Sequence, residues 1–142
     1  MTSYSDDFLR QILDGTKTIA LVGFSNKPDR PSFRVATYLA EQGYRVIPIN
    51  PGLAGQDFMG ETIVADLSSI PKDAGVDMLD VFRRSEFVLP VVEQALAELP
   101  GLKTVWLQIG VESEAAAAVA AEKGLAFVQD RCPKIEHARL KG

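Results

Sequence analysis

The stretch that decides the fold of this chain is residues 19–34, Ile19-Ala-Leu-Val-Gly-Phe-Ser-Asn-Lys-Pro-Asp-Arg-Pro-Ser-Phe-Arg34. It begins as an apolar run, breaks at Gly23, crosses a short polar loop and resumes a helix-spaced apolar pattern after Pro31. That order predicts a buried strand, a tight turn and the start of a helix. In a parallel α/β sheet, the N–H groups at such a helix start attract anions, so the turn predicts a phosphate-bearing ligand.

Length, composition and charge restrict the class of protein. The chain has 142 residues, 46% of them hydrophobic, which predicts one domain over residues 1–142. Its net charge of −4 disfavours sequence-independent nucleic-acid binding. No apolar run approaches the ~20 residues of a membrane span, and the N-terminus does not resemble a signal peptide, so we expect neither a membrane nor a nucleic-acid partner. A single cysteine, Cys132, excludes an intrachain disulfide and favours the reducing cytoplasm.

Strand and helix patterns alternate along the chain. We expect helices over residues 5–14, 31–43, 85–99 and 113–123, and strands over residues 18–23, 44–49, 76–81, 103–109 and 125–128. Pro48 is expected to weaken the pairing of the second strand. A minor strand at residues 62–64 and a helical turn at 68–70 are predicted, whereas the tail from Gln129 shows no clear period. The connections are too long for hairpins, which predicts an α/β fold with a Rossmann-like doubly wound parallel sheet of about five strands.

Cations gather where the predicted strands end. In an open α/β sheet, ligands bind outside the carboxyl ends of the strands. In this acidic chain, those ends and the helix start beside them carry Lys27, Arg30, Arg34, Arg83, Arg84 and Arg131. We expect one of the two adjacent arginines, Arg83 and Arg84, to face the site. The set favours a ligand with several phosphates.

A nicotinamide dinucleotide fits the predicted turn less well. The dinucleotide fingerprint G-x-G-x-x-G is replaced by Gly23-Phe-Ser-Asn-Lys-Pro28, in which only the first glycine matches. The acidic residue expected after the second strand is absent, because Ile49-Asn50-Pro51 stands there. An NAD(P)-binding redox module therefore remains an alternative that lacks two expected contacts.

Five segments together resemble a known family, the bacterial stand-alone CoA-binding proteins, whose domain also forms the N-terminal part of the succinyl-CoA synthetase α subunit. The resemblance extends from about Leu13 to Leu140. The segments are Ile19-Ala-Leu-Val-Gly-Phe-Ser-Asn-Lys-Pro-Asp-Arg-Pro-Ser, Val46-Ile-Pro-Ile-Asn-Pro51, Val76-Asp-Met-Leu-Asp-Val-Phe-Arg83, Val105-Trp-Leu-Gln-Ile-Gly-Val111 and Asp130-Arg-Cys-Pro133. Each is weak alone, and their order makes the match specific.

The resemblance implies a Rossmann-like fold that binds coenzyme A. It places the loop from Ser25 to Pro28 on the CoA phosphates, and the segment from Phe82 to Arg84 on the adenosine or pantetheine path. Leu53 stands where the synthetase has a lysine, so other cations are expected to compensate. The synthetase also needs a domain with a phosphorylated histidine and a partner subunit, so its ligase activity is not expected here. The cofactor-binding candidates are Gly23, Phe24, Ser25, Asn26, Lys27, Pro28, Arg30, Ser32, Arg34, Asn50, Pro51, Phe82 and Arg83.

The resemblance thus implies a protein that binds CoA or acyl-CoA, and we expect it to have no catalysis of its own. A regulatory or interaction subunit whose nucleotide site acts as a sensor is a further alternative. Cys132 lacks an evident base, since the only histidine is His137 in the tail, and these two residues cannot form a metal site alone. Trp106 is expected in the core. Asp77 and Asp80 are expected on opposite faces of a strand, not as an acid–base pair.

Overall fold

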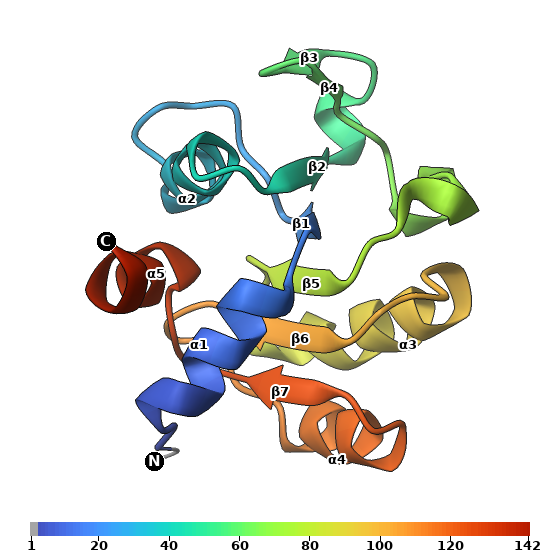
Figure 1. Cartoon of the computed structure of the whole chain (residues 1–142). Coiled ribbons are helices and arrows are strands. Elements are labelled where there is room, and N and C mark those ends of the chain that lie inside the picture. Colours follow the sequence, from blue (N-terminus) through green and yellow to red (C-terminus); the bar gives the residue numbers. More distant parts are fainter. Residues whose placement is uncertain (1–2) are drawn as a thin grey trace.

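The main element of the structure, a computed structural model that describes residues 3–142, is a parallel sheet of five strands (Figure 1). The strands lie in the order β2-β1-β5-β6-β7. Each predicted strand is present, usually one or two residues shorter than expected. Their bounds are Thr18–Val22 (β1), Arg45–Ile49 (β2), Met78–Val81 (β5), Thr104–Leu107 (β6) and Ala126–Val128 (β7). The predicted doubly wound α/β fold is therefore confirmed.

Helices cover both faces of the sheet. One face packs under α1, α2 and α5 and the other under α3 and α4, as Figure 1 shows. Ser5 and Ser113 stand at the first residues of two predicted helices and are the N-caps of α1 and α4. Their hydroxyls accept hydrogen bonds from the N–H groups of Phe8 and Ala116. The helix bounds are Asp6–Gly15 (α1), Pro31–Glu41 (α2), Val88–Glu98 (α3), Glu114–Glu122 (α4) and Pro133–Lys141 (α5).

Pro48 does not weaken the sheet, contrary to the prediction. Parallel pairing continues through Leu21 with Pro48 and Val22 with Ile49. The reason is that β2 is an edge strand whose Pro48 carbonyl accepts a hydrogen bond from Val64 N–H at 3.1 Å. The proline nitrogen faces the same outer side, so its missing N–H costs the pairing with β1 nothing.

Two other predictions are corrected. The tail has no clear apolar period, but residues 133–141 form α5, which packs against α1 and α2. The helix predicted over residues 85–99 does not start at Ser85, because a 3-10 turn, Ser85–Phe87, precedes α3, which starts at Val88 with Pro90 in its first turn. The Ser85 hydroxyl instead accepts a hydrogen bond from Glu112 N–H.

The connection between β2 and β5 is irregular. It contains a small hairpin, β3 (Asp57–Phe58) with β4 (Glu61–Thr62), and three 3-10 turns at Pro51–Leu53, Leu67–Ser69 and Lys72–Ala74. The predicted minor strand at 62–64 corresponds to β4 and the isolated bridge of Val64 with Ile49. Within residues 3–142, no helix has the length and apolar character needed to cross a membrane.

Candidate nucleotide site at the carboxyl ends of the strands

The strand order reverses direction between β1 and β5, and the loops that follow these two strands meet there. Such a switch point is where ligands of open α/β sheets bind. Gly23, which follows β1, has φ +87°, and a Cβ atom on it would lie 2.3 Å from the carbonyl oxygen of Phe82, which follows β5. Only glycine allows this approach of the two chain segments.

The end of β2 holds the same turn from the other side. The Ile49 carbonyl accepts hydrogen bonds from the N–H groups of Gly23 and Phe24 at 3.3 and 3.2 Å. Asn50 donates from Nδ2 to the Phe24 carbonyl and accepts at Oδ1 from Gly52 N–H, both at 2.7 Å. Asn50 therefore orients the turn and completes its backbone bonding.

The loop between Gly23 and α2 is held by its own polar groups. The buried Ser32 hydroxyl accepts a hydrogen bond from Ser25 N–H at 3.0 Å, and the Ser25 hydroxyl accepts one from Lys27 N–H at 3.2 Å. The Lys27 carbonyl in turn accepts from Arg30 N–H at 3.0 Å. The loop is thus a defined turn whose Ser25 hydroxyl hydrogen is still available to a ligand.

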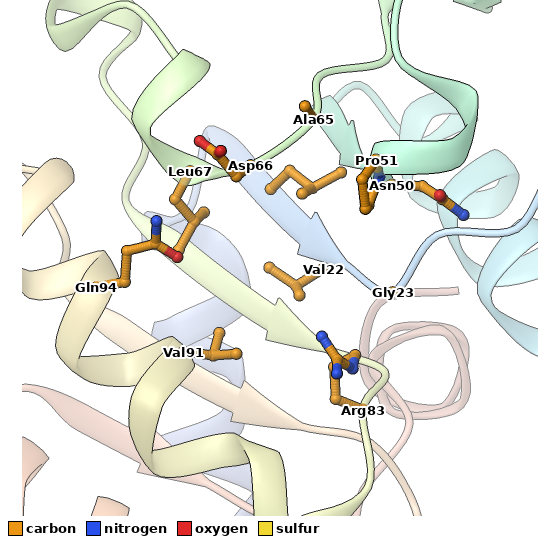
Figure 2. A pocket seen from close by; sticks show the side chains of 11 residues that line it. Val22, Gly23, Asn50, Pro51, Ala65, Asp66, Leu67, Arg83, Val91 and Gln94 are labelled. Atoms are coloured by element: carbon orange, nitrogen blue, oxygen red, sulfur yellow. The ribbon is translucent and has the colours of Figure 1, made fainter.

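A cavity of about 490 Å³ lies beside this turn, between β1, β2 and α3 (Figure 2). We refer to it as the nucleotide cavity. Its walls are largely apolar and its polar groups stand at the edges, which suits a flat organic ring with a charged substituent. Its lining residues are Val22, Gly23, Ile49, Asn50, Pro51, Ala65, Asp66, Leu67, Arg83, Val91 and Gln94.

Four of the thirteen candidate residues line this cavity: Gly23, Asn50, Pro51 and Arg83. A further five are in the adjoining loop, with Ser25 half-buried and the others exposed. These five are Ser25, Asn26, Lys27, Pro28 and Arg30.

The remaining four candidates lie elsewhere. Phe24 is only 1% exposed and packs edge-on against Phe58 with ring centroids 4.9 Å apart, so only its backbone can reach a ligand. Ser32 is buried under the loop, and Phe82 is half-buried in the same core cluster as Phe24. Arg34 lines a different cavity, between α2 and α5.

Seven lining residues were not predicted as site residues, and two of them, Val22 and Ile49, are the last residues of β1 and β2. Ala65, Asp66 and Leu67 come from the irregular connection, and Val91 and Gln94 come from α3. The sequence contained one signal of a turn in this part of the wall. Asp66 lies two residues before Ser68, the spacing of an Asx turn, and its carboxylate accepts a hydrogen bond from Ser68 N–H. Hydrogen bonds from Ser68 hold the pKa of Asp66 below its usual value, so this cavity edge is anionic at neutral pH.

Cations surround the turn without being neutralised by neighbours. Within residues 3–142, neither Lys27 nor Arg30 forms an ion pair, and both are exposed. Arg83 and Arg84 both stack on the Phe87 ring, at 4.8 and 5.2 Å from its centroid, but only Arg83 lines the nucleotide cavity. Arg84 pairs with Glu86 at 3.5 Å.

Leu53 supplies no charge at the position where the resemblance to the synthetase implied a lysine. This residue lies in the 3-10 turn after β2 and is half-buried against the core cluster that contains Phe24 and Phe58. Its side chain contributes packing rather than charge at this corner of the site.

The two reactive side chains of the tail lie away from the nucleotide cavity. Cys132 is buried at the N-cap of α5, and the His137 ring is bound through Nδ1 to the Tyr38 hydroxyl at 2.9 Å. Burial, followed by the charge of Lys141, lowers the pKa of His137. Trp106 is fully buried, as predicted, and donates from Nε1 to the Arg131 carbonyl.

Asp77 and Asp80 have separate environments. Asp77 accepts hydrogen bonds from the N–H groups of Lys17 and Thr18 at the amino edge of the sheet. Asp80 is fully buried in β5, and neither of its carboxylate oxygens has a hydrogen-bond partner among residues 3–142. Burial raises the pKa of Asp80 well above its usual value. In the same part of the chain, no three His, Cys, Asp or Glu side chains are grouped as metal ligands.

Comparison with known proteins finds relatives that match almost the whole chain. The uncharacterized protein YneT of Bacillus subtilis (strain 168) is 37% identical over 134 residues, which cover 94% of each chain. A structure from Thermus thermophilus, described as cell-free ID.343, is 39% identical, has a TM-score of 0.88 and is matched over 96% of this chain and 99% of its own.

A dinucleotide-forming acetyl-coenzyme A synthetase from Ca. Korarchaeum cryptofilum shares the fold, with a TM-score of 0.62 at 23% identity. It is matched over 87% of this chain but only 27% of its own. The sequence model of the CoA binding domain matches residues 17–138. That match covers both loops of the switch point and the whole sheet, and the chain therefore belongs to the CoA-binding domain family.

Proposed function

We propose that this protein binds coenzyme A or an acyl-CoA at the carboxyl ends of β1, β2 and β5, and that it carries the ligand without transforming it. The observation that supports this most directly is the nucleotide cavity of about 490 Å³ with Gly23, Asn50 and Arg83 at its edge. Membership of the CoA-binding domain family supports the identity of the ligand.

The cavity and the loop suit different parts of CoA. The apolar walls formed by Val22, Ile49 and Leu67 would enclose the adenine ring, which gains from burial of its faces. The phosphates would lie on the turn from Ser25 to Arg30, beside the free N–H groups of the first turn of α2. Among residues 3–142, no acidic side chain pairs with Lys27 or Arg30 there. Arg83 would connect the two regions with a charge-assisted hydrogen bond.

The polar residues that line the cavity favour binding over chemistry. They are Asn50, Asp66, Arg83 and Gln94, and none of them pairs a nucleophile with a base. Asn50 is already engaged in the backbone of the turn, and the Asp66 carboxylate caps a 3-10 turn. These roles are those of a binding site that positions its ligand.

The neighbouring arginines provide a matched test. Arg83→Ala should weaken CoA binding about tenfold or more in calorimetry, since a hydrogen bond to a charged group contributes roughly 1.5–3 kcal/mol. Arg84 also stacks on the Phe87 ring but does not line the cavity, so Arg84→Ala should leave the CoA affinity unchanged. Equal losses in both variants would contradict the placement of the ligand.

The identity of the ligand is tested by comparing CoA with NAD. CoA should raise the melting temperature of the protein by more than NAD at the same concentration, because the ligand with the lower Kd for the folded state stabilises it more. An equal or larger shift with NAD would favour the redox-module alternative. Native mass spectrometry of the purified protein gives an independent reading, since a co-purified CoA or acyl-CoA would appear as a discrete added mass.

A further inference from the structure

The two ends of the nucleotide cavity carry opposite charges. Among its described lining residues, Arg83 is the only cation and Asp66 is the only anion. Figure 2 shows Arg83 beside Gly23 at one end, with Asp66 and Gln94 on the other side of Val22. The loop after Gly23, with its exposed cations, adjoins the Arg83 end. The cavity is therefore positive beside this loop and negative opposite it.

This polarity favours one orientation of a bound nucleotide. The phosphates are attracted to Arg83 and the cationic loop, and they are repelled by the Asp66 carboxylate. In a purine nucleotide the sugar is attached at N9, and the Watson–Crick edge lies on the opposite side of the base. When the phosphates lie at the loop, this edge of the base therefore faces Asp66 and Gln94.

Ser68 holds the Asp66 carboxylate at the rim of the cavity. The Ser68 N–H, at 2.8 Å, and the Ser68 hydroxyl both donate hydrogen bonds to Asp66 Oδ1. These bonds, the hydroxyl bond most of all, lower the pKa of Asp66, so the group is ionised at neutral pH and can only accept hydrogen bonds. An ionised carboxylate has about four acceptor positions, so it can accept further hydrogen bonds from a ligand.

Gln94 supplies the donor that the carboxylate lacks. It follows Val91 by three residues on the face of α3 that lines the cavity, and its amide is turned toward the cavity in Figure 2. The amide presents one acceptor oxygen and two donor hydrogens. By rotating, this amide can pair with more than one kind of base edge, so the choice between bases depends on Asp66.

We infer that Asp66 and Gln94 together recognise the Watson–Crick edge of adenine and discriminate against oxopurines such as hypoxanthine, an inference that rests on the proposed function. Adenine presents a donor amino group beside the acceptor N1, whereas an oxopurine presents a carbonyl oxygen beside a donor N1–H. The adenine amino group would donate to Asp66 while Gln94 donates to N1. With hypoxanthine, the Asp66 carboxylate would face a second acceptor with no proton between them.

Two ligands that differ only in the base test this inference. The deaminated analogue of CoA carries hypoxanthine in place of adenine and has the same phosphates and pantetheine arm. Both side chains are exposed, so we expect moderate discrimination. In calorimetry, wild type should bind CoA roughly ten- to a hundred-fold more tightly than the analogue. Equal affinity for the two ligands would overturn the inference and leave the proposed function standing.

Asp66→Asn tests the residue that makes the choice. Asparagine can keep the turn, because its amide oxygen can accept the hydrogen bonds from Ser68. Its amino group can also donate to the carbonyl oxygen of hypoxanthine, so the affinities for CoA and for the analogue should become similar. Asp73→Asn removes the same charge at an exposed position outside the cavity, and it should leave the preference for CoA unchanged. A preference that persists undiminished in Asp66→Asn would overturn the role of Asp66.

Gln94→Leu tests the donor to N1. Loss of one hydrogen bond should weaken CoA binding roughly two- to tenfold in calorimetry. Glu93 is the exposed neighbour of Gln94 on α3 and does not line the cavity, so Glu93→Leu should leave the CoA affinity unchanged. An unchanged CoA affinity in Gln94→Leu would overturn the role of Gln94.

The free nucleotides AMP and IMP separate this inference from the proposed function. At equal concentration, AMP should raise the melting temperature of wild type by more than IMP, and the difference should disappear in Asp66→Asn. If CoA does not bind but AMP is preferred to IMP, the proposed function fails and the recognition of adenine stands. If CoA binds but neither pair of ligands is discriminated, the recognition of adenine is overturned. Failure of all four ligands to bind would refute both.

Discussion

Substitution of Gly23 by alanine tests the geometry on which the whole site depends. The added Cβ would meet the Phe82 carbonyl oxygen at 2.3 Å and its carbonyl carbon at 2.9 Å, and the residue would have to keep φ +87°. The left-handed conformation costs roughly 1–2 kcal/mol for an L-residue. The close contact is with backbone, which is also fixed by the hydrogen bond from Phe82 N–H to the Val22 carbonyl at 2.8 Å. Overpacking of this kind costs roughly 1–3 kcal/mol.

Together these terms predict that Gly23→Ala lowers the free energy of unfolding by about 2–5 kcal/mol. For a chain of this size, that corresponds to a decrease in Tm of roughly 6–20 °C. Urea unfolding followed by the fluorescence of Trp106, which is the only tryptophan and fully buried, measures the free energy directly. The variant should also bind CoA more weakly at temperatures where it is folded, because the two loops must separate.

Gly60→Ala is the matched control. Gly60 has φ +89°, but a Cβ atom there meets nothing within 4 Å, so only the conformational cost of about 1–2 kcal/mol applies. CoA binding should be unchanged in this control. If Gly23→Ala were no less stable than Gly60→Ala, the loops after β1 and β5 would not approach as closely as described, and the reasoning about the site would be refuted.

Three other expectations concern buried and exposed charges. Burial raises the pKa of Asp80, so the folded protein keeps a proton that the unfolded chain releases above about pH 4. The free energy of unfolding should therefore fall by up to about 1.4 kcal/mol per pH unit above pH 4. Urea titrations of Asp80→Asn should lack this slope, and an unchanged slope would contradict the role of Asp80. Because the pKa of His137 is lowered in the folded protein, the stability that its neutral ring contributes is fully present above about pH 6.5 and is lost as the pH falls toward the folded-state pKa. His137→Phe should therefore show a smaller decrease in Tm between pH 7 and pH 5 than wild type, and an equal decrease would contradict this role. Arg30 is expected to contact the 3′-phosphate of CoA, so wild type should bind dephospho-CoA roughly ten- to a hundred-fold more weakly in calorimetry, with a smaller difference in Arg30→Ala. Equal affinity for the two ligands would refute that contact.

Local sequence signals were sufficient to predict most of the helices and strands. The apolar runs that became β1 and β5 are buried on both faces, so any reading of hydrophobic pattern finds them. Ser5 and Pro31 mark helix starts because capping and proline geometry act within a few residues. The turn at Gly23 is equally local, since its positive φ favours glycine over other residues.

Helix α5 could not be found in this way because tertiary contacts define it. Its sequence is polar, yet Glu136 and His137 are buried, one through an ion pair with Arg139 and the other through the Tyr38 hydroxyl. Arg139 also pairs with Asp6 of α1 at 2.9 Å. Polar partners far apart in the chain take the place of an apolar stripe, and no periodicity in the sequence records them.

The same division applies to the site. The sequence alone determined that cations, Gly23 and Asn50 would stand at the carboxyl ends of the strands, because a parallel sheet brings all those ends to one edge. Only the tertiary structure decided that Arg83 rather than Arg84 lines the nucleotide cavity, and that Arg34 lies at the cavity between α2 and α5 instead. The direction of a side chain beyond a strand end depends on how the following turn and helix pack. That packing is determined by contacts across the sheet, which sequence spacing does not specify.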